Sequence, residues 1–190
     1  MNETAPRTPE GDPLDPESAA LAAALLEIGR HVDGETLRAP RWFALARSAA
    51  LLAQQPGIAA LLGVEATDVL GADAAHLTPI ELEELPAMHD PLESLAAVSW
   101  PDIAVGGALA LDLPAASWRS RIDDSDAQAR RTAEALDGGT LRVLVAATQD
   151  GVTYSALRRA GDRPSGPARY VMGPALLPEL TQALAESLHG

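Results

Sequence analysis

The dipeptide formed by Asp150 and Gly151 separates two runs of residues that alternate as β-strands do. Residues 141–148 precede it and residues 152–159 follow it. Asp-Gly between two such runs is a strong signal for a β-hairpin with a two-residue turn, because both residues tolerate the positive φ angles that this turn requires. The sequence therefore predicts an antiparallel pair of strands, and this narrows the possible folds more than any other feature.

Amphipathic helices are predicted near both ends of the chain. Asp15 followed by Pro16 is typical of a helix start, and we expect this helix to end at Gly34. Helical spacing places four apolar residues on one face of this helix, which are Leu21, Leu25, Ile28 and Val32. The same spacing places four leucines on one face of a predicted C-terminal helix, which are Leu177, Leu180, Leu184 and Leu188. We expect both apolar faces to pack on the same face of the sheet.

The middle of the chain alternates between short strand and helix patterns. Strands are predicted over 41–47, 78–85 and 105–113, and helices over 48–54, 56–63, 90–98 and 126–137. Residues 1–14 are predicted to be a disordered tail, because they are rich in proline and acidic residues. The remainder, 15–190, is long enough for one domain with a real core.

The predicted fold class is α+β, with a mainly antiparallel sheet of about five strands and helices packed on it. A partly parallel α/β sheet is the alternative, because helices are interspersed among the strands. Of the 190 residues 47% are apolar, but many of these are alanine. The core must therefore depend on a limited set of leucine, isoleucine, valine and tryptophan side chains.

The adjacent glycines Gly106 and Gly107 are a possible phosphate-binding loop. A dinucleotide loop needs the spacing G-x-G-x-x-G between a strand and a helix, and here no third glycine follows and the next residues continue a strand. Glycine inside a strand more often marks a bulge or a close approach to the backbone. We interpret the pair as part of an ordinary strand that has no side chains at these two positions.

The composition excludes several classes of function. All 14 basic residues are arginine and no cysteine is present. A P-loop lysine, a Schiff-base lysine, a thiol nucleophile and a cysteine-ligated metal are therefore impossible. The net charge of −13 opposes binding to nucleic acids and to anionic membrane surfaces. The first residues do not form a signal peptide and no apolar run is long enough to span a membrane, so a cytoplasmic location follows by elimination.

No catalytic, cofactor-binding or metal-binding residue is predicted. The histidines, which are His31, His76, His89 and His189, have no metal-ligand spacing, and the serine-hydrolase pattern G-x-S-x-G is absent. The acidic run 123–126 lies at the start of a predicted helix, where carboxylates are favourable, and it lacks the glycine and distal glutamate of a calcium loop.

Arg142, Arg159 and Asp112 are the candidate ligand-binding residues. A two-residue turn places Arg142 opposite Arg159, while Val143, Val145, Ala147, Tyr154 and Ala156 share the core-like face. If strand 105–113 pairs antiparallel with 141–148, then Asp112 lies beside Arg142. A solvated row of charges is the plainer interpretation, and a site for an anion bound by planar guanidinium groups is the more specific one.

Four segments of the chain resemble an uncharacterised actinobacterial protein family of unknown function. They are residues 25–32, 41–63, 77–85 with 94–111, and 149–158 with 173–188. The resemblance covers most of the chain after residue 18 and implies a free-standing cytoplasmic protein. It implies no activity and no site residues.

Two hypotheses for function follow from these patterns. The first is a non-enzymatic protein-interaction or chaperone-like module, with an unidentified protein partner or a second copy of the chain in a homodimer, since no catalytic motif is present and the surface is acidic. The second is a small anionic-ligand-binding protein or an enzyme that uses the sheet arginines with Asp112. A concave pocket with several converging polar groups would favour the second hypothesis.

Overall fold

A computed structural model of the chain describes residues 14–54, 74–83, 90–114, 117, 139–161, 170–174 and 176–189. Six strands form one sheet in the order β2-β1-β3-β4-β5-β6, and all neighbouring strands are antiparallel. They are β1 (Arg41–Arg47), β2 (Leu77–Glu81), β3 (Ala104–Pro114), β4 (Thr140–Thr148), β5 (Thr153–Arg159) and β6 (Val171–Gly173). The predicted antiparallel α+β fold is confirmed, and the parallel alternative is wrong for these strands.

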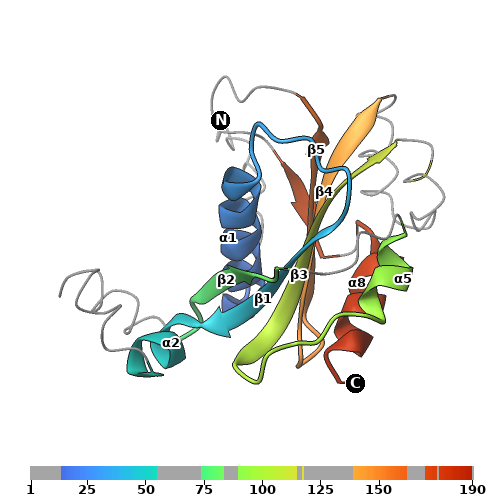
Figure 1. The fold of residues 1–190 in the computed structure, drawn as a ribbon. Helices are drawn as coiled ribbons and strands as arrows, with labels where there is room; N and C mark the ends of the chain where they lie inside the picture. The colour runs from blue at the N-terminus through green and yellow to red at the C-terminus, as the bar shows by residue number, and fades with distance from the viewer. Residues whose placement is uncertain are drawn as a thin grey trace, which may run out of the picture.

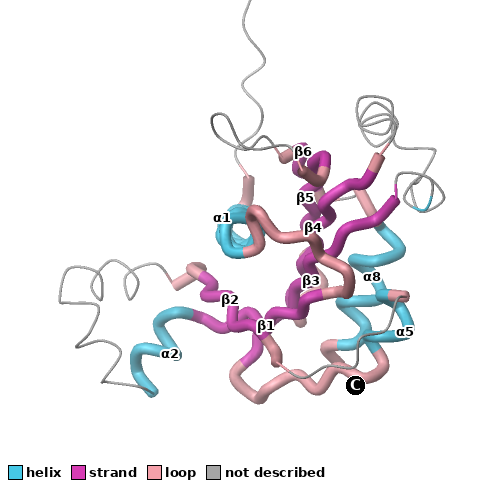
Figure 2. Tube along the Cα trace, turned by 45° about the horizontal axis from the view of Figure 1, so that its top comes forward, coloured by secondary structure: helices cyan, strands magenta, loops and turns pink. Residues whose placement is uncertain are grey.

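Helices cover both faces of this sheet. In the described part of the chain they are α1 (Pro16–His31), α2 (Ser48–Gln54), α5 (Pro91–Leu95) and α8 (Pro178–Ser187). Helix α1 packs on one face, and α5 and α8 pack together on the other (Figure 1). Figure 2 shows the same three layers from a different angle, with the sheet between α1 and the α5–α8 pair.

The first and last helices therefore pack on opposite faces, and the expectation that they share a face is wrong. Alternate residues of β3 and β4 belong to two separate cores, with Leu109 and Val143 facing α8 and Ala108 and Leu144 facing α1. Small side chains such as alanine leave room for a helix to approach the sheet closely. The alternation of large and small residues thus marks two buried faces rather than one buried and one solvated face.

Helix α1 begins and packs as its sequence predicts. The carboxylate of Asp15 accepts hydrogen bonds from the backbone N–H groups of Glu17 at 3.1 Å and Ser18 at 3.0 Å, and Pro16 is the first helical residue. The predicted apolar stripe of α1 is fully buried, and the leucine stripe of α8 is also buried. The two stripes supply much of the large apolar surface in a chain that is rich in alanine.

Gly106 and Gly107 lie inside β3, which agrees with their interpretation as part of a strand rather than a phosphate-binding loop. Leu45 pairs with Gly106 and Ala46 pairs with Ala104, so β3 carries one extra residue, Val105, in a bulge. A Cβ atom on Gly107 would lie 2.5 Å from the Trp100 indole ring. Glycine is therefore needed at 107 because an aromatic ring lies directly on the backbone.

The hairpin between β4 and β5 has a three-residue loop. Thr148 pairs with Val152 through its backbone N–H group at 2.9 Å, and Gly151 has a φ of +84°. In such loops a turn is followed by one residue in the left-handed conformation, which glycine adopts without strain. The predicted two-residue turn is wrong, and the register of the two strands is shifted by one residue.

The remaining predictions agree with the structure in part. The predicted strand over 78–85 is shorter, because β2 ends at Glu81, and helix α5 covers only the first half of the helix predicted over 90–98. The predicted tail up to residue 13, the helices over 56–63 and 126–137, His89 and the acidic run 123–126 lie outside the described residues.

Replacing Gly107 with alanine should destabilise the protein by about 1–3 kcal/mol, because the new methyl group would overlap the Trp100 ring. Urea unfolding measures this loss. The Trp100→Phe background is the control, because phenylalanine lacks the outer indole atoms that would meet the methyl group. An equal loss in both backgrounds would contradict the role given to the ring.

Candidate functional site

Two of the three predicted site residues form a buried ion pair. Asp112 pairs with Arg142 across β3 and β4, as the predicted strand order requires. Arg142 Nε donates to Asp112 Oδ1 at 2.5 Å, and Arg142 Nη2 donates to Asp112 Oδ2 at 3.1 Å. The side chains are 2% and 6% exposed, so this part of the row is not solvated, contrary to the plainer interpretation.

The third predicted residue, Arg159, does not join this pair. The shifted hairpin register places Arg158 opposite Arg142, whereas Arg159 pairs with Leu141 and is exposed. The same shift places Tyr154 and Ala156 on the α1 face, away from Val143, Val145 and Ala147 on the α8 face. Both errors have one cause, since a one-residue slip turns every side chain of a strand to the other face.

Backbone groups of the α1–β1 connection accept further hydrogen bonds from Arg142. Its Nη1 donates to the carbonyl oxygen of Val32 at 2.8 Å, and its Nη2 donates to that of Glu35 at 2.5 Å. Asp112 Oδ2 accepts from the backbone N–H of Leu37 at 2.9 Å. These contacts occupy four of the five N–H donors of the guanidinium group. Arg142 therefore clamps residues 32–37 onto the sheet and has little capacity left for a ligand.

Arg158 forms a second ion pair beside this clamp. Its Nη2 donates to Asp33 Oδ1 at 2.6 Å, and its guanidinium carbon lies 5.2 Å from the centre of the Tyr170 ring. The hydrogen bond from Arg158 lowers the pKa of Asp33, and burial raises the pKa of Tyr170. Arg158 becomes part of the site because the hairpin loop has three residues instead of the predicted two, which places Arg158 opposite Arg142.

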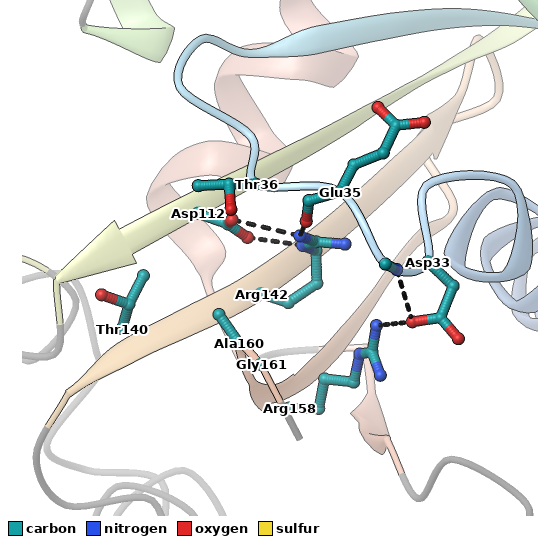
Figure 3. Close-up of a pocket in the computed structure, with 10 residues that line it drawn as sticks. Asp33, Glu35, Thr36, Asp112, Thr140, Arg142, Arg158, Ala160 and Gly161 are labelled. Atoms are coloured by element: carbon teal, nitrogen blue, oxygen red, sulfur yellow. Dashed lines mark hydrogen bonds and ion pairs between the residues drawn. The ribbon is translucent and has the colours of Figure 1, made fainter. Parts of the chain in front are cut away.

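A cavity of about 570 Å³ opens over the two arginines (Figure 3). Its volume is within the range of ~300–1,000 Å³ that is typical of small-molecule pockets. It is lined by residues 33–36 of the α1–β1 connection, and by Asp112, Thr140, Arg142, Arg158, Ala160 and Gly161. The cavity is concave and several polar groups converge on it, as the hypothesis of a ligand-binding protein requires. Each arginine, however, is already paired with a carboxylate.

A larger groove of about 1,120 Å³ lies on the opposite side of the sheet, between α5 and α8. Most of its large side chains are apolar, and the charged side chains among its described lining residues, Asp102 and Glu186, are acidic. Its lining includes Leu92, Leu95, Val98, Trp100, Leu188, Asp102 and Glu186. Trp100 is held in place by an edge-to-face contact with Trp42 and by a hydrogen bond from its Nε1 to Ser187 Oγ at 3.2 Å.

Ser48 and His76 are close together, although 28 positions separate them in the sequence. Ser48 Oγ lies 2.6 Å from His76 Nδ1 and 2.7 Å from Thr78 Oγ1. A serine beside a histidine can act as a nucleophile with its base, but the Ser48 residue is only 2% exposed. Among the described residues no carboxylate bonds His76, so the contact is best explained as a link between β2 and the start of α2. No sequence motif signals this long-range pair.

A network of charges joins α1 to the edge of the sheet. Arg41 binds Glu81 through Nε at 2.5 Å and Nη2 at 2.6 Å, and its Nη1 donates to Glu35 at 2.7 Å. His31 Nε2 lies 2.9 Å from the second carboxylate oxygen of Glu81. The hydrogen bond from Arg41 lowers the pKa of Glu81. The described residues contain no group of three or more histidine and acidic side chains arranged to hold a metal ion.

A family model described as PPA1309-like protein matches residues 21–189. The chain belongs to this family. The PPA1309-like family is uncharacterised, so membership agrees with the predicted resemblance to a family of unknown function and assigns no role to any residue. No curated protein and no solved structure matches the chain. In the described part of the chain, no helix is both long enough and apolar enough to cross a membrane.

Replacing Asp112 with alanine should destabilise the protein by about 3–5 kcal/mol, because a buried guanidinium group would lose its charged partner. Chemical unfolding measures the change. The matched control is Glu17→Ala, which removes one side of the more exposed Glu17–Arg47 pair at 3.7 Å and should cost about 0–1 kcal/mol. Equal losses in the two variants would show that the Arg142–Asp112 pair is not the clamp described above.

Acid should weaken the fold through Asp33 and Glu81. Both carboxyl groups have a pKa lowered by arginine, so they contribute stability above their ordinary pKa range, and this contribution is lost as the pH falls through the lowered values. The free energy of unfolding should therefore decrease below about pH 5. Asp33→Asn should make this decrease shallower, and an unchanged slope would contradict the contribution of the Asp33–Arg158 pair.

Proposed function

We propose that this PPA1309-like protein is a non-enzymatic protein-interaction module. In this proposal the groove between α5 and α8 holds an apolar segment of a partner protein that is flanked by basic residues. The observation that carries the proposal is the combination of an apolar groove with a rim that contains Asp102 and Glu186 and, among its described lining residues, no basic side chain. The proposal keeps the cytoplasmic location expected from the sequence.

The size and the walls of the groove suit a segment of chain. Its volume of about 1,120 Å³ is above the range of ~300–1,000 Å³ typical of small-molecule pockets. Its walls come from two helices and from the residues that lead into β3, so an extended or helical segment could lie along it. Helix-in-groove and similar modes of recognition use apolar anchors spaced along one side of the bound segment.

Trp100 is the best anchor in the groove. Its ring rests on Gly107 and makes an edge-to-face contact with Trp42, and its Nε1 donates to Ser187 Oγ. A side chain held on three sides loses little conformational entropy when a partner binds. Tryptophan is also among the residues that contribute most to binding energy at protein interfaces.

Charge complementarity determines the chemistry of the partner. The chain carries a net charge of −13, and the acidic residues at the groove add a local negative potential. Such a potential accelerates association with a basic segment and disfavours an acidic one. Exposed charges are screened by salt, so binding should weaken as the ionic strength rises.

A pair of labelled model peptides tests the proposal. Both are amphipathic and contain leucine, but one carries lysine and the other glutamate on its polar face. Fluorescence anisotropy should show saturable binding of the lysine peptide alone. Glu186→Arg should weaken this binding by about tenfold, which corresponds to ~1.4 kcal/mol. Ala183→Phe should also weaken it, because the larger side chain would fill part of the groove.

Glu27→Arg is the matched control, because it makes the same change of charge at an exposed position on α1, on the other face of the sheet. Equal weakening in Glu27→Arg and Glu186→Arg would show that the peptide responds only to net charge and would contradict the groove. A dimer in sedimentation experiments that Ala183→Phe dissociates would identify a second copy of the chain as the occupant and overturn the proposed partner.

A further inference from the structure

The two partners of the Asp33–Arg158 ion pair are unequally buried. The Arg158 side chain is 8% exposed, whereas that of Asp33 is 34% exposed. Figure 3 shows the pair at one end of the 570 Å³ cavity, with Asp33 on the α1–β1 connection and Arg158 on β5. The positive charge is therefore part of the cavity wall, and the negative charge lies on its solvent side.

Arg158 is held in position, whereas Asp33 lies nearer to solvent, where its Oδ1 also accepts from the backbone N–H of Gly34 at 3.1 Å. The guanidinium group lies against the Tyr170 ring at 5.2 Å, and the residue itself lies near the end of β5, the strand between β4 and β6. Asp33 follows the last residues of α1 and precedes Gly34, whose φ is +79°. An anion that took the place of the Asp33 carboxylate would find the arginine already oriented, so it would not lose affinity in ordering that side chain.

Arg142 cannot exchange its carboxylate partner for an anion in the same way. Its guanidinium group is 2% exposed, binds both oxygens of Asp112, and bonds two backbone carbonyl groups. An anion could displace Asp112 only by breaking the clamp on residues 32–37. Exchange is thus confined to Arg158.

The exchange puts one negative charge on Arg158 in place of another, and the displaced Asp33 carboxylate remains on the solvent side of the cavity. A monoanion that replaces the Asp33 carboxylate on Arg158 leaves the charge at the arginine unchanged. The remaining negative charges of the protein that lie farther away than about 8 Å are largely screened at physiological salt. The cavity is also larger than a single carboxylate or phosphate group, and Thr36 and Thr140 supply polar walls for the rest of a small molecule.

We infer that this cavity binds a small molecule through a carboxylate or phosphate group, which displaces Asp33 and forms a charge-assisted pair with Arg158. The planar guanidinium group suits both oxyanions, because two of its N–H groups can meet two oxygens. The inference is independent of the proposed groove, which lies on the other face of the sheet.

Acetate and inorganic phosphate are the probes, with chloride at equal ionic strength as the reference. Each is titrated into the full chain while the melting temperature is followed. At least one of them should raise the melting temperature of the wild-type protein in a saturable way. The probe that does so tells whether the ligand carries a carboxylate or a phosphate.

Two variants test the exchange itself. Asp33→Ala removes the built-in competitor, so it should tighten binding of the active probe by about tenfold or more. Arg158→Gln should abolish the response, and Arg158→Lys, which retains the charge and lacks the planar fork, should weaken it. Circular dichroism verifies that each variant is folded. Arg159→Gln is the control on the same strand, because that residue faces away from the cavity, and its response should equal that of the wild type.

Several results would overturn the inference. One is the absence of a saturable response in the wild type, even if Asp33→Ala binds, because the ion pair would then be purely structural. Another is a response that Arg158→Gln leaves intact. A third is equal affinity in wild type and Asp33→Ala, which would show that the anion does not compete with Asp33.

Discussion

Arg142 holds its guanidinium group inside the protein against Asp112 and two backbone carbonyl groups, and several features of the fold depend on that arrangement. A buried arginine is unfavourable unless nearly all of its donors are bonded. Here the partners come from β3 and from the segment that joins α1 to β1. The pair can therefore form only when β3 lies beside β4 and the end of α1 lies above both. One side chain thus couples the strand order to the position of the first helix.

The alanine-rich composition has a structural role in the same region. The face of the sheet that carries Arg142 also carries Ala108, Ala110, Ala146 and Ala156, all fully buried. Small side chains let α1 approach the sheet closely, so its four large apolar residues supply most of the contact. The opposite face has leucine and valine at the corresponding positions and packs against α5 and α8. Alternating small and large residues therefore produce a three-layer structure from a limited number of large side chains.

Local patterns predicted much of this fold. The cap at Asp15, the two leucine-rich stripes, the antiparallel pairing and the contact of Asp112 with Arg142 all follow from residues close in sequence or from strand order. The prediction failed where one residue of loop length mattered. The three-residue loop at Gly151 shifted the register, moved Tyr154 to the other face and replaced Arg159 with Arg158 in the site. Contacts between distant segments, such as Ser48 with His76, have no local signal in the sequence.

The two candidate sites lie on opposite faces of one tightly packed sheet. The cavity at Arg158 belongs to the α1 face, and the groove at Trp100 belongs to the α8 face. The central strands β3 and β4 contribute side chains to both faces, so any slip in their register would disrupt both sites at once. Small adjustments of side chains on one face do not require such a slip, because the backbone hydrogen bonds of the sheet remain in place. A ligand in the cavity and a partner in the groove can therefore bind independently unless the sheet itself changes register.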